Sequence, residues 1–379
     1  MSSHLVSVTA DAIHHTLART AEDLLNYDIL GVAAQLVIPG IPEPITVASG
    51  PVSADGDRPL TGSELYPIGS QSKTFTAACV LLLAREGAIR LTDPISRYLP
   101  GLPIVDDSAT IEQFLMHTSG IGDFVAGYLE LPHPMPSFTF DELMTLARVQ
   151  GKRFEAGSRY EYCNTDIVVL ARMCELVTGT PFEQLLRQRI FEPLGMHDTF
   201  AAAGQPLPRE RMARGYYVPE NGYVGPPIDT TALKDFSVAS ASGNIVSSLP
   251  DMLRWTTAMQ SPENPTGLSV ADFVVDPIDA GSTPPHWFSQ GLGDRGIEGI
   301  RWAGRTFWGH RGGFYGYLSA TFFDPESGIS FASFMTMTTR RGIIHIPDET
   351  QAYNFQTFLQ LCATTAMNAV ESPQPQPAS

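Results

Sequence analysis

The sequence predicts an α+β fold in which an antiparallel β-sheet is flanked by helices and interrupted by a long, mostly helical insertion. Amphipathic helical patterns and β-rich runs occur at both ends of the chain, whereas helical patterns dominate the middle. We therefore expect a discontinuous sheet domain, residues 5–85 and 286–367, and a helical domain, residues 86–285. The cleft between two such parts is a usual place for a site.

The N-terminal part of the chain predicts a helix, two strands and a second helix. Residues 10–27 repeat apolar side chains at near-helical spacing. Residues 31–38 and 45–49 are β-rich, and a loop rich in proline and glycine separates them. Residues 71–86 are rich in alanine and leucine and are followed by Gly87, a usual C-terminal cap.

The remaining patterns predict three further helices and a β-hairpin. The helices are expected at residues 165–178, 181–189 and 348–364, and the hairpin strands at 318–323 and 329–335. A strand is also expected to begin near Gly291, in a Gln-Gly-Leu-Gly run. The polar, proline-rich end of the chain predicts a disordered tail over residues 368–379.

The composition excludes several classes of partner. Of 379 residues, 43% are hydrophobic and 17% are charged, and the net charge is -16. Such an acidic chain is not suited to bind nucleic acid or an anionic membrane surface, because both need basic patches. No run of about 18 apolar residues predicts a membrane span. The N-terminus lacks the pattern of a secretory signal, so we expect a cytoplasmic location.

Four cysteines show no pattern typical of a zinc site or a disulfide framework. Cys79, Cys163, Cys174 and Cys362 include no Cys-x-x-Cys pair. We expect free, mostly buried thiols in a reducing compartment. The adjacent pair His14-His15 is expected on a solvated helix face, since neighbours on a helix diverge and cannot chelate one metal.

The chemistry-bearing residues begin with Ser70-Gln71-Ser72-Lys73, where a strand-like stretch turns into a helix. Residues three apart lie on one face of a helix, so the spacing places an amine beside a hydroxyl. A serine hydroxyl is a weak nucleophile at neutral pH and needs such a base. Two later segments accompany this one in order: Tyr162-Cys163-Asn164 and His310-Arg311-Gly312-Gly313.

This ordered set resembles the penicillin-recognising serine hydrolases, whose motifs are Ser-x-x-Lys, Tyr-x-Asn and Lys-Thr-Gly or its His-x-Gly variant. The resemblance covers residues 30–335. It is greatest to the branch that contains class C β-lactamases, DD-carboxypeptidases, D-aminopeptidases, D-amino-acid amidases and related esterases. It implies a β-lactamase/transpeptidase-like fold.

The resemblance also implies an acyl-enzyme mechanism. Ser70 is expected to attack a carbonyl carbon, and either Lys73 or Tyr162 to accept its proton. The sequence leaves the choice between these two bases open. No metal or organic cofactor is needed for this chemistry.

Substrate-binding roles follow from the same resemblance. Asn164 is expected to offer its amide to Lys73 and to substrate, and His310, on an edge strand, to donate a hydrogen bond near Tyr162 or the leaving group. Backbone N–H groups of Ser70 and Gly313 are expected to form the oxyanion hole. Glycines at 312 and 313 allow close approach to the strand.

Arg311 departs from the family pattern. Relatives often have Thr or Ser at this position, which contacts a substrate carboxylate. Arg311 is expected either to bind such a carboxylate or to point to solvent. His117 and Ser119, in a His-Thr-Ser-Gly run, are expected to brace a helix start, and Cys163 to pack behind the Tyr162 loop.

The motifs do not fix the substrate. Because the chain shows no export signal, we expect a D-amino-acid amidase, D-aminopeptidase or esterase that cleaves a small amide or ester. A DD-carboxypeptidase or β-lactamase is the less favoured hydrolase. The alternatives are an acyltransferase that uses the same residues and a non-catalytic binding protein on this scaffold. The partner is a small molecule, and the oligomeric state stays open.

Overall fold

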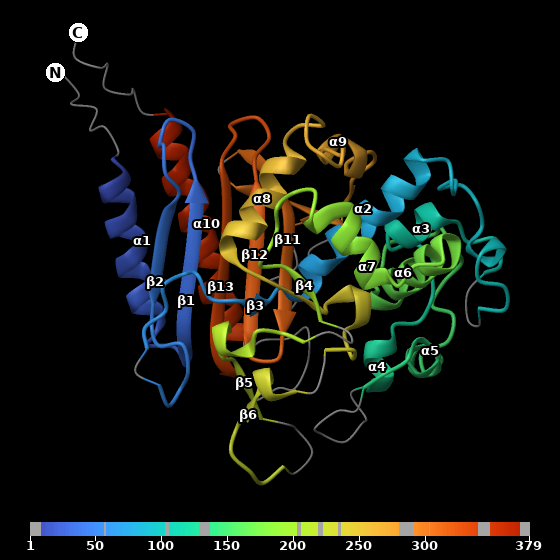
Figure 1. Ribbon diagram of the computed structural model, residues 1–379, viewed down its shortest axis with the longest axis horizontal. Coiled ribbons are helices and arrows are strands. Elements are labelled where there is room, and N and C mark those ends of the chain that lie inside the picture. Colours follow the sequence, from blue (N-terminus) through green and yellow to red (C-terminus); the bar gives the residue numbers. More distant parts are fainter. Residues whose placement is uncertain are drawn as a thin grey trace.

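The computed structural model describes residues 9–56, 58–102, 106–128, 137–202, 206–218, 223–233, 236–279, 291–302, 304–339 and 349–371. The chain forms a large sheet with helices on both faces, as the sequence predicts (Figure 1). Its helices are α1 Ala10–Leu24, α2 Ser72–Arg85, α3 Ile111–Leu115, α4 Phe124–Tyr128, α5 Phe140–Ala147, α6 Asn164–Thr178, α7 Phe182–Leu186, α8 Leu249–Met259, α9 Val270–Phe273 and α10 Glu349–Glu371.

The main sheet is antiparallel along its path and joins the two ends of the chain. Its order is β2-β1-β13-β12-β11-β10-β9-β8, so the N-terminal hairpin pairs with the C-terminal strand β13. These strands are β1 Ile29–Val37, β2 Ile45–Ser49, β8 Ile278–Asp279, β9 Gly291–Asp294, β10 Ile297–Trp302, β11 Arg305–Phe314, β12 Tyr317–Phe323 and β13 Ser330–Thr339. The shorter strands are β3 Tyr66–Pro67, β4 Phe200–Ala201, β5 Tyr216–Tyr217, β6 Ile228–Asp229 and β7 Ile245–Ser247.

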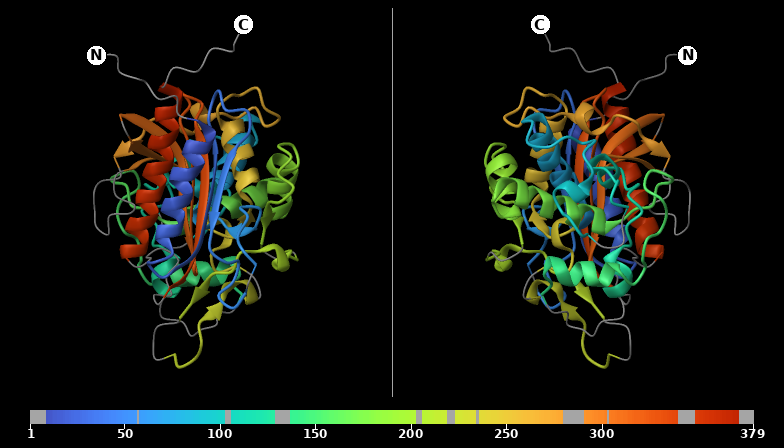
Figure 2. Two further views of the ribbon diagram at one scale, coloured as in Figure 1. Left: turned by 90° about the vertical axis from the view of Figure 1, so that its left-hand side faces the viewer. Right: turned by 90° about the vertical axis from the view of Figure 1, so that its right-hand side faces the viewer.

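Two apolar cores lie on opposite faces of this sheet. Helices α1 and α10 cover one face, and α8 with the inserted helices lies on the other (Figure 2). Successive residues of β1 alternate between the cores: Val32 and Ala34 belong to the core beneath α1 and α10, and Ala33 to the core on the other side. Successive side chains of a strand point to opposite faces of the sheet, and here both faces are buried.

The expected insertion is not separate from the sheet. Helix α8, strand β5 and strand β8 all come from residues 86–285, yet α8 packs on β1, β12 and β13. Strand β5 pairs with β13, and β8 pairs with β9. Helices α3 to α7 form the helical part beside the sheet (Figure 1).

The predicted elements occur close to where the sequence places them, and the largest difference is at the C-terminal helix, which was expected to end at residue 364. The tail was expected to begin at residue 368, but α10 continues to Glu371. Ala366 and Ala369 are both buried in the core beneath this helix, so its apolar face extends past the expected end. Residues 372–379 lie outside the described part. None of the helices in the described part is long and apolar enough to cross a membrane.

Candidate active site

The turn that carries Ser70 is fixed by close contact with strand β11. A short 3₁₀ helix, Gly69–Gln71, leads into α2. Gly69 has φ 54°, and a Cβ added to it would lie 2.6 Å from the carbonyl oxygen of Gly313. Glycine is therefore required at position 69 for its conformation and for space. Ser70 is consequently held against β11 and is only 1% exposed.

Lys73 lies in the first turn of α2 and points at Ser70. Its Nζ is 3.0 Å from Ser70 Oγ, 2.8 Å from Asn164 Oδ1 and 2.9 Å from the carbonyl oxygen of Ser242. The amide and carbonyl oxygens can only accept hydrogen bonds, so each takes one N–H of the amine. A neutral amine has two N–H groups and one lone pair. The lone pair then faces Ser70 Oγ, which is the geometry of a general base.

The surroundings of Lys73 favour this neutral form. Its side chain is fully buried, and burial lowers the pKa of Lys73 from 10.5 to about 7, although the negative charge of Asp123 acts in the opposite direction. A large fraction of Lys73 is thus uncharged at neutral pH. The structure places the amide oxygen of Asn164 against Lys73 Nζ.

Tyr162 lies beside both members of this pair. The Nζ of Lys73 is 4.9 Å from the centroid of the Tyr162 ring. Burial raises the pKa of Tyr162 well above 10, while a hydrogen bond with Ser70 lowers it in part. The phenol is therefore protonated at neutral pH and is placed to pass a proton rather than to act as the resting base.

His310 lies on an interior strand and not on an edge strand. Strand β11 is followed in the sheet by β10, β9 and β8, so the expected position was wrong. The short contact of His310 Nδ1 with the carbonyl oxygen of Arg311 requires the proton on Nδ1, because a carbonyl only accepts. Burial lowers the pKa of His310 to about 4. Its Nε2 therefore carries a lone pair at neutral pH and accepts, rather than donates, a hydrogen bond.

Arg311 does not point to solvent. Its side chain is 3% exposed and forms an ion pair with Glu298 of the neighbouring strand β10. Arg311 Nε lies 2.9 Å from Glu298 Oε1, and Nη2 contacts the same oxygen. The carboxylate that this guanidinium binds in the structure is thus one supplied by the chain itself.

The two glycines after Arg311 allow β11 to pass close to the nucleophile turn. A Cβ at Gly312 would lie 1.9 Å from the carbonyl oxygen of Ile68, which is not possible without moving the backbone. Gly313 is the residue that Gly69 approaches. Both glycines thus lie against the segment that leads into Ser70.

Sequence reasoning missed three residues of this cluster. Asp123 Oδ2 accepts hydrogen bonds from the backbone N–H and the side-chain Nδ2 of Asn164. Ser242 supplies a carbonyl oxygen to Lys73 from a 3₁₀ turn, and Glu298 pairs with Arg311. The only local signal for Asp123 is its position two residues after a Ser-Gly-Ile run. The only local signal for Ser242 is its Ala-Ser-Ala-Ser-Gly run.

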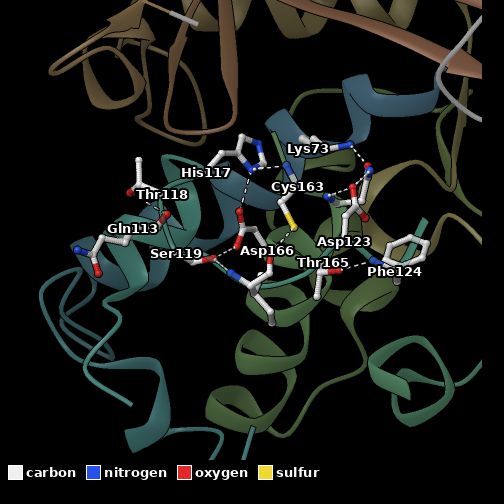
Figure 3. A network of polar contacts seen from close by, with 12 residues as sticks. Lys73, Gln113, His117, Thr118, Ser119, Asp123, Phe124, Cys163, Thr165 and Asp166 are labelled. Carbon is white, nitrogen blue, oxygen red and sulfur yellow. Dashed lines mark hydrogen bonds and ion pairs between the residues drawn. The ribbon is translucent and has the colours of Figure 1, made fainter. Parts of the chain in front are cut away.

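A second polar network braces the start of α6, as expected for His117 and Ser119 (Figure 3). Asp166, in the first turn of that helix, is 3.0 Å from His117 Nδ1 and accepts a hydrogen bond from Ser119 Oγ. Burial lowers the pKa of His117 to about 3 and raises that of Asp166 well above its usual range. His117 and Asp166 therefore share one proton between them and carry no net charge. Their contact fixes the start of the helix that begins at Asn164.

The four cysteines are free and buried, as the sequence predicts. Cys163 is buried, with its sulfur 3.6 Å from the carbonyl oxygen of Ile121. Across the described ranges, no group of three or more His, Cys, Asp or Glu side chains is placed to hold a metal ion.

Similarity to known proteins extends over most of the chain. A family model described as Beta-lactamase matches residues 17–344. Penicillin-binding protein 4 of Amycolatopsis lactamdurans is 25% identical over 294 residues, which are 75% of this chain and 75% of that protein. Putative penicillin-binding protein PbpX of Bacillus subtilis (strain 168) is 30% identical over 54% of this chain, but over only 47% of that protein.

Two solved amidohydrolases share the fold over nearly their whole length. D-amino acid amidase from Ochrobactrum anthropi SV3, in complex with L-phenylalanine amide, matches with a TM-score of 0.81 and 26% identity, over 94% of this chain and 99% of that chain. D-stereospecific amidohydrolase from Streptomyces sp. matches with a TM-score of 0.72 and 25% identity, over 90% and 97%.

Proposed function

Because this chain belongs to the beta-lactamase family, we propose that it is a serine hydrolase that cleaves a small amide or ester through an acyl-enzyme on Ser70. The observation that carries this proposal is the environment of Lys73. Two oxygens that can only accept take both N–H groups of the neutral amine, and its lone pair then faces Ser70 Oγ at 3.0 Å. Such a pair is an activated nucleophile.

The proposed reaction follows from this arrangement. Ser70 Oγ forms a bond to the carbonyl carbon while its proton passes to Lys73 Nζ. The resulting oxyanion is stabilised by the backbone N–H groups of Ser70 and Gly313. The proton then passes, through the Tyr162 phenol, to the departing amine or alcohol as the carbonyl carbon releases it. Water hydrolyses the acyl-enzyme and restores Ser70.

His310 takes part as a hydrogen-bond acceptor in this proposal. Its Nδ1 proton is engaged by the strand backbone, so Nε2 presents a lone pair beside Tyr162, with the two rings 6.4 Å apart between centroids. A neutral imidazole can orient a phenol or a leaving group that carries a proton. Asn164 holds Lys73 through its amide oxygen, and its amide nitrogen donates to Asp123.

The preferred substrate class is the amide of a D-amino acid or a related small amide or ester. The support is the likeness to D-amino acid amidase, which spans 94% of this chain and 99% of the solved one. The likeness to Penicillin-binding protein 4 spans a smaller share, 75% of this chain and 75% of that protein. We place the DD-carboxypeptidase and β-lactamase activities second for that reason.

Intact-mass spectrometry of the protein tests the proposal. The panel contains D- and L-amino-acid amides, short nitrophenyl esters and a β-lactam. We expect at least one compound to add the mass of its acyl group to the wild-type protein and none to add mass to Ser70→Ala. Full turnover of the same compound by Ser70→Ala, or the absence of acylation across the panel, would overturn the proposal.

A further inference from the structure

Glu298 forms an unusually complete ion pair with Arg311. The Arg311 backbone N–H donates to Glu298 Oε2 at 3.1 Å, and its Nε lies 2.9 Å from Oε1 and 3.2 Å from Oε2. The side chains are 3% and 13% exposed, so the pair is shielded from water. The positive charge of Arg311 and its hydrogen bonds hold the pKa of Glu298 below its usual value, against the effect of burial. Glu298 is thus ionised and matches the charge of the guanidinium.

The pair lies at the candidate active site. The charge of Glu298 raises the pKa of Tyr162 and of His310, and that of Arg311 lowers the pKa of His310, so both charges of the pair act on residues of the site. Its strand neighbour Glu298 projects from β10. An unmatched positive charge at this position would therefore act on any group bound near Ser70.

The other basic groups of the cluster do not supply a positive charge for a substrate carboxylate. Lys73 is directed at Ser70 and the two accepting oxygens, and its pKa is lowered to about 7. His310 is neutral at that pH. Arg311 is the remaining cation of the cluster, and Glu298 already occupies its guanidinium. The acidic net charge of -16 further disfavours the approach of an anion.

We propose that Glu298 is a specificity-determining residue, which neutralises Arg311 and so restricts the enzyme to acyl donors without a carboxylate near the scissile bond. This inference rests on the proposed function, because it concerns the substrates of the same site. The enzyme is thus expected to prefer neutral amides and esters over substrates whose leaving group carries a negative charge.

A pair of esters that differ only in one carboxylate tests the inference. The probes are 4-nitrophenyl acetate and 3-carboxy-4-nitrophenyl acetate, each with kcat/KM divided by its rate constant for hydrolysis by hydroxide. For the wild-type protein, we expect the neutral ester to be favoured by about tenfold or more. For Glu298→Gln, which retains the shape but removes the charge, we expect this ratio to fall by about tenfold.

The double variant Glu298→Gln/Arg311→Gln is the matched control. It removes both charges, so we expect a ratio within a few-fold of the wild-type ratio. If the single variant does not fold, the wild-type ratio still tests the inference, and the double variant is expected to fold because a buried pair is often replaced by neutral groups without loss of stability.

The possible failures are distinguishable. If neither ester is cleaved through Ser70, the proposed function fails. If the neutral ester is cleaved but the wild-type protein accepts the carboxylated ester equally well, the inference alone is overturned. A folded Glu298→Gln with an unchanged ratio, or a double variant that prefers the carboxylated ester, would overturn it as well.

Discussion

Asp123 fixes the direction in which the amide of Asn164 points. Its Oδ2 lies 2.9 Å from Asn164 Nδ2, and the same oxygen receives the Asn164 backbone N–H at 3.2 Å. The amide oxygen of Asn164 is thereby turned toward Lys73 Nζ at 2.8 Å. Asp123 thus determines which end of this amide faces Lys73 Nζ (Figure 3).

Replacement of Asp123 by Asn tests this positioning role. Asp123 raises the pKa of Lys73, so its removal should lower that pKa and move the acidic limb of the kcat/KM profile below pH 7. The value of kcat should fall by about tenfold to a hundredfold, because the Asn164 amide loses its orientation. The exposed Asp107→Asn serves as the control and should leave both unchanged. A tenfold loss with an unshifted profile would contradict the electrostatic part of the account.

Removal of the imidazole of His310 tests whether it contributes to the chemistry. We expect His310→Ala to lower kcat/KM by about a hundredfold, the usual contribution of a positioned proton-handling group. The acidic limb assigned to Lys73 should remain, since His310 is already neutral there. His15→Ala, on the exposed face of α1, controls for a general effect of losing a histidine. Activity within about threefold of wild type would remove His310 from the mechanism.

Alanine substitutions at two glycines with positive φ distinguish the effect of backbone strain from the effect of steric contact. Gly87 has φ 74° and open space around its Cβ position, whereas Gly69 has φ 54° and the Gly313 backbone 2.6 Å away. Gly87→Ala should lower the free energy of unfolding by about 1 kcal/mol and leave activity intact. Gly69→Ala should lower it by about 2–4 kcal/mol and also reduce kcat/KM, because Ser70 must move. Chemical denaturation measures the free energy of unfolding of the two variants, and steady-state kinetics measures their kcat/KM. Equal effects of the two substitutions would contradict the close contact at Gly69.

Local sequence patterns identify residues that the structure brings together at the candidate site, because the spacing of these residues depends on short-range geometry. Ser70 and Lys73 share one helix face, and Asn164 begins the helix that follows Tyr162, so motif spacing was enough to identify them. The hairpin of β12 and β13 was predicted from its turn for the same reason.

The remaining features depend on long-range packing that no local pattern records. Glu298 reaches Arg311 only because β10 pairs with β11, and Ser242 reaches Lys73 from 169 residues away in the sequence. The expected edge position of His310 was wrong because three short strands, β8 to β10, extend the sheet beyond β11. Their glycine-rich, charged sequences carry a weak strand signal.

The pH dependence of the acylation rate tests the central claim, that neutral Lys73 activates Ser70, most directly. Burst kinetics with a nitrophenyl ester, recorded from pH 5.5 to 10, report the rate constant for acylation of the wild-type protein. Because the pKa of Lys73 is about 7, the neutral base is depleted below this pH, and the rate should rise with an apparent pKa near 7 and then stay constant. A rate that continues to rise through pH 9 to 10 without a plateau would contradict the account, since it would require an unshifted lysine or a phenolate as the base.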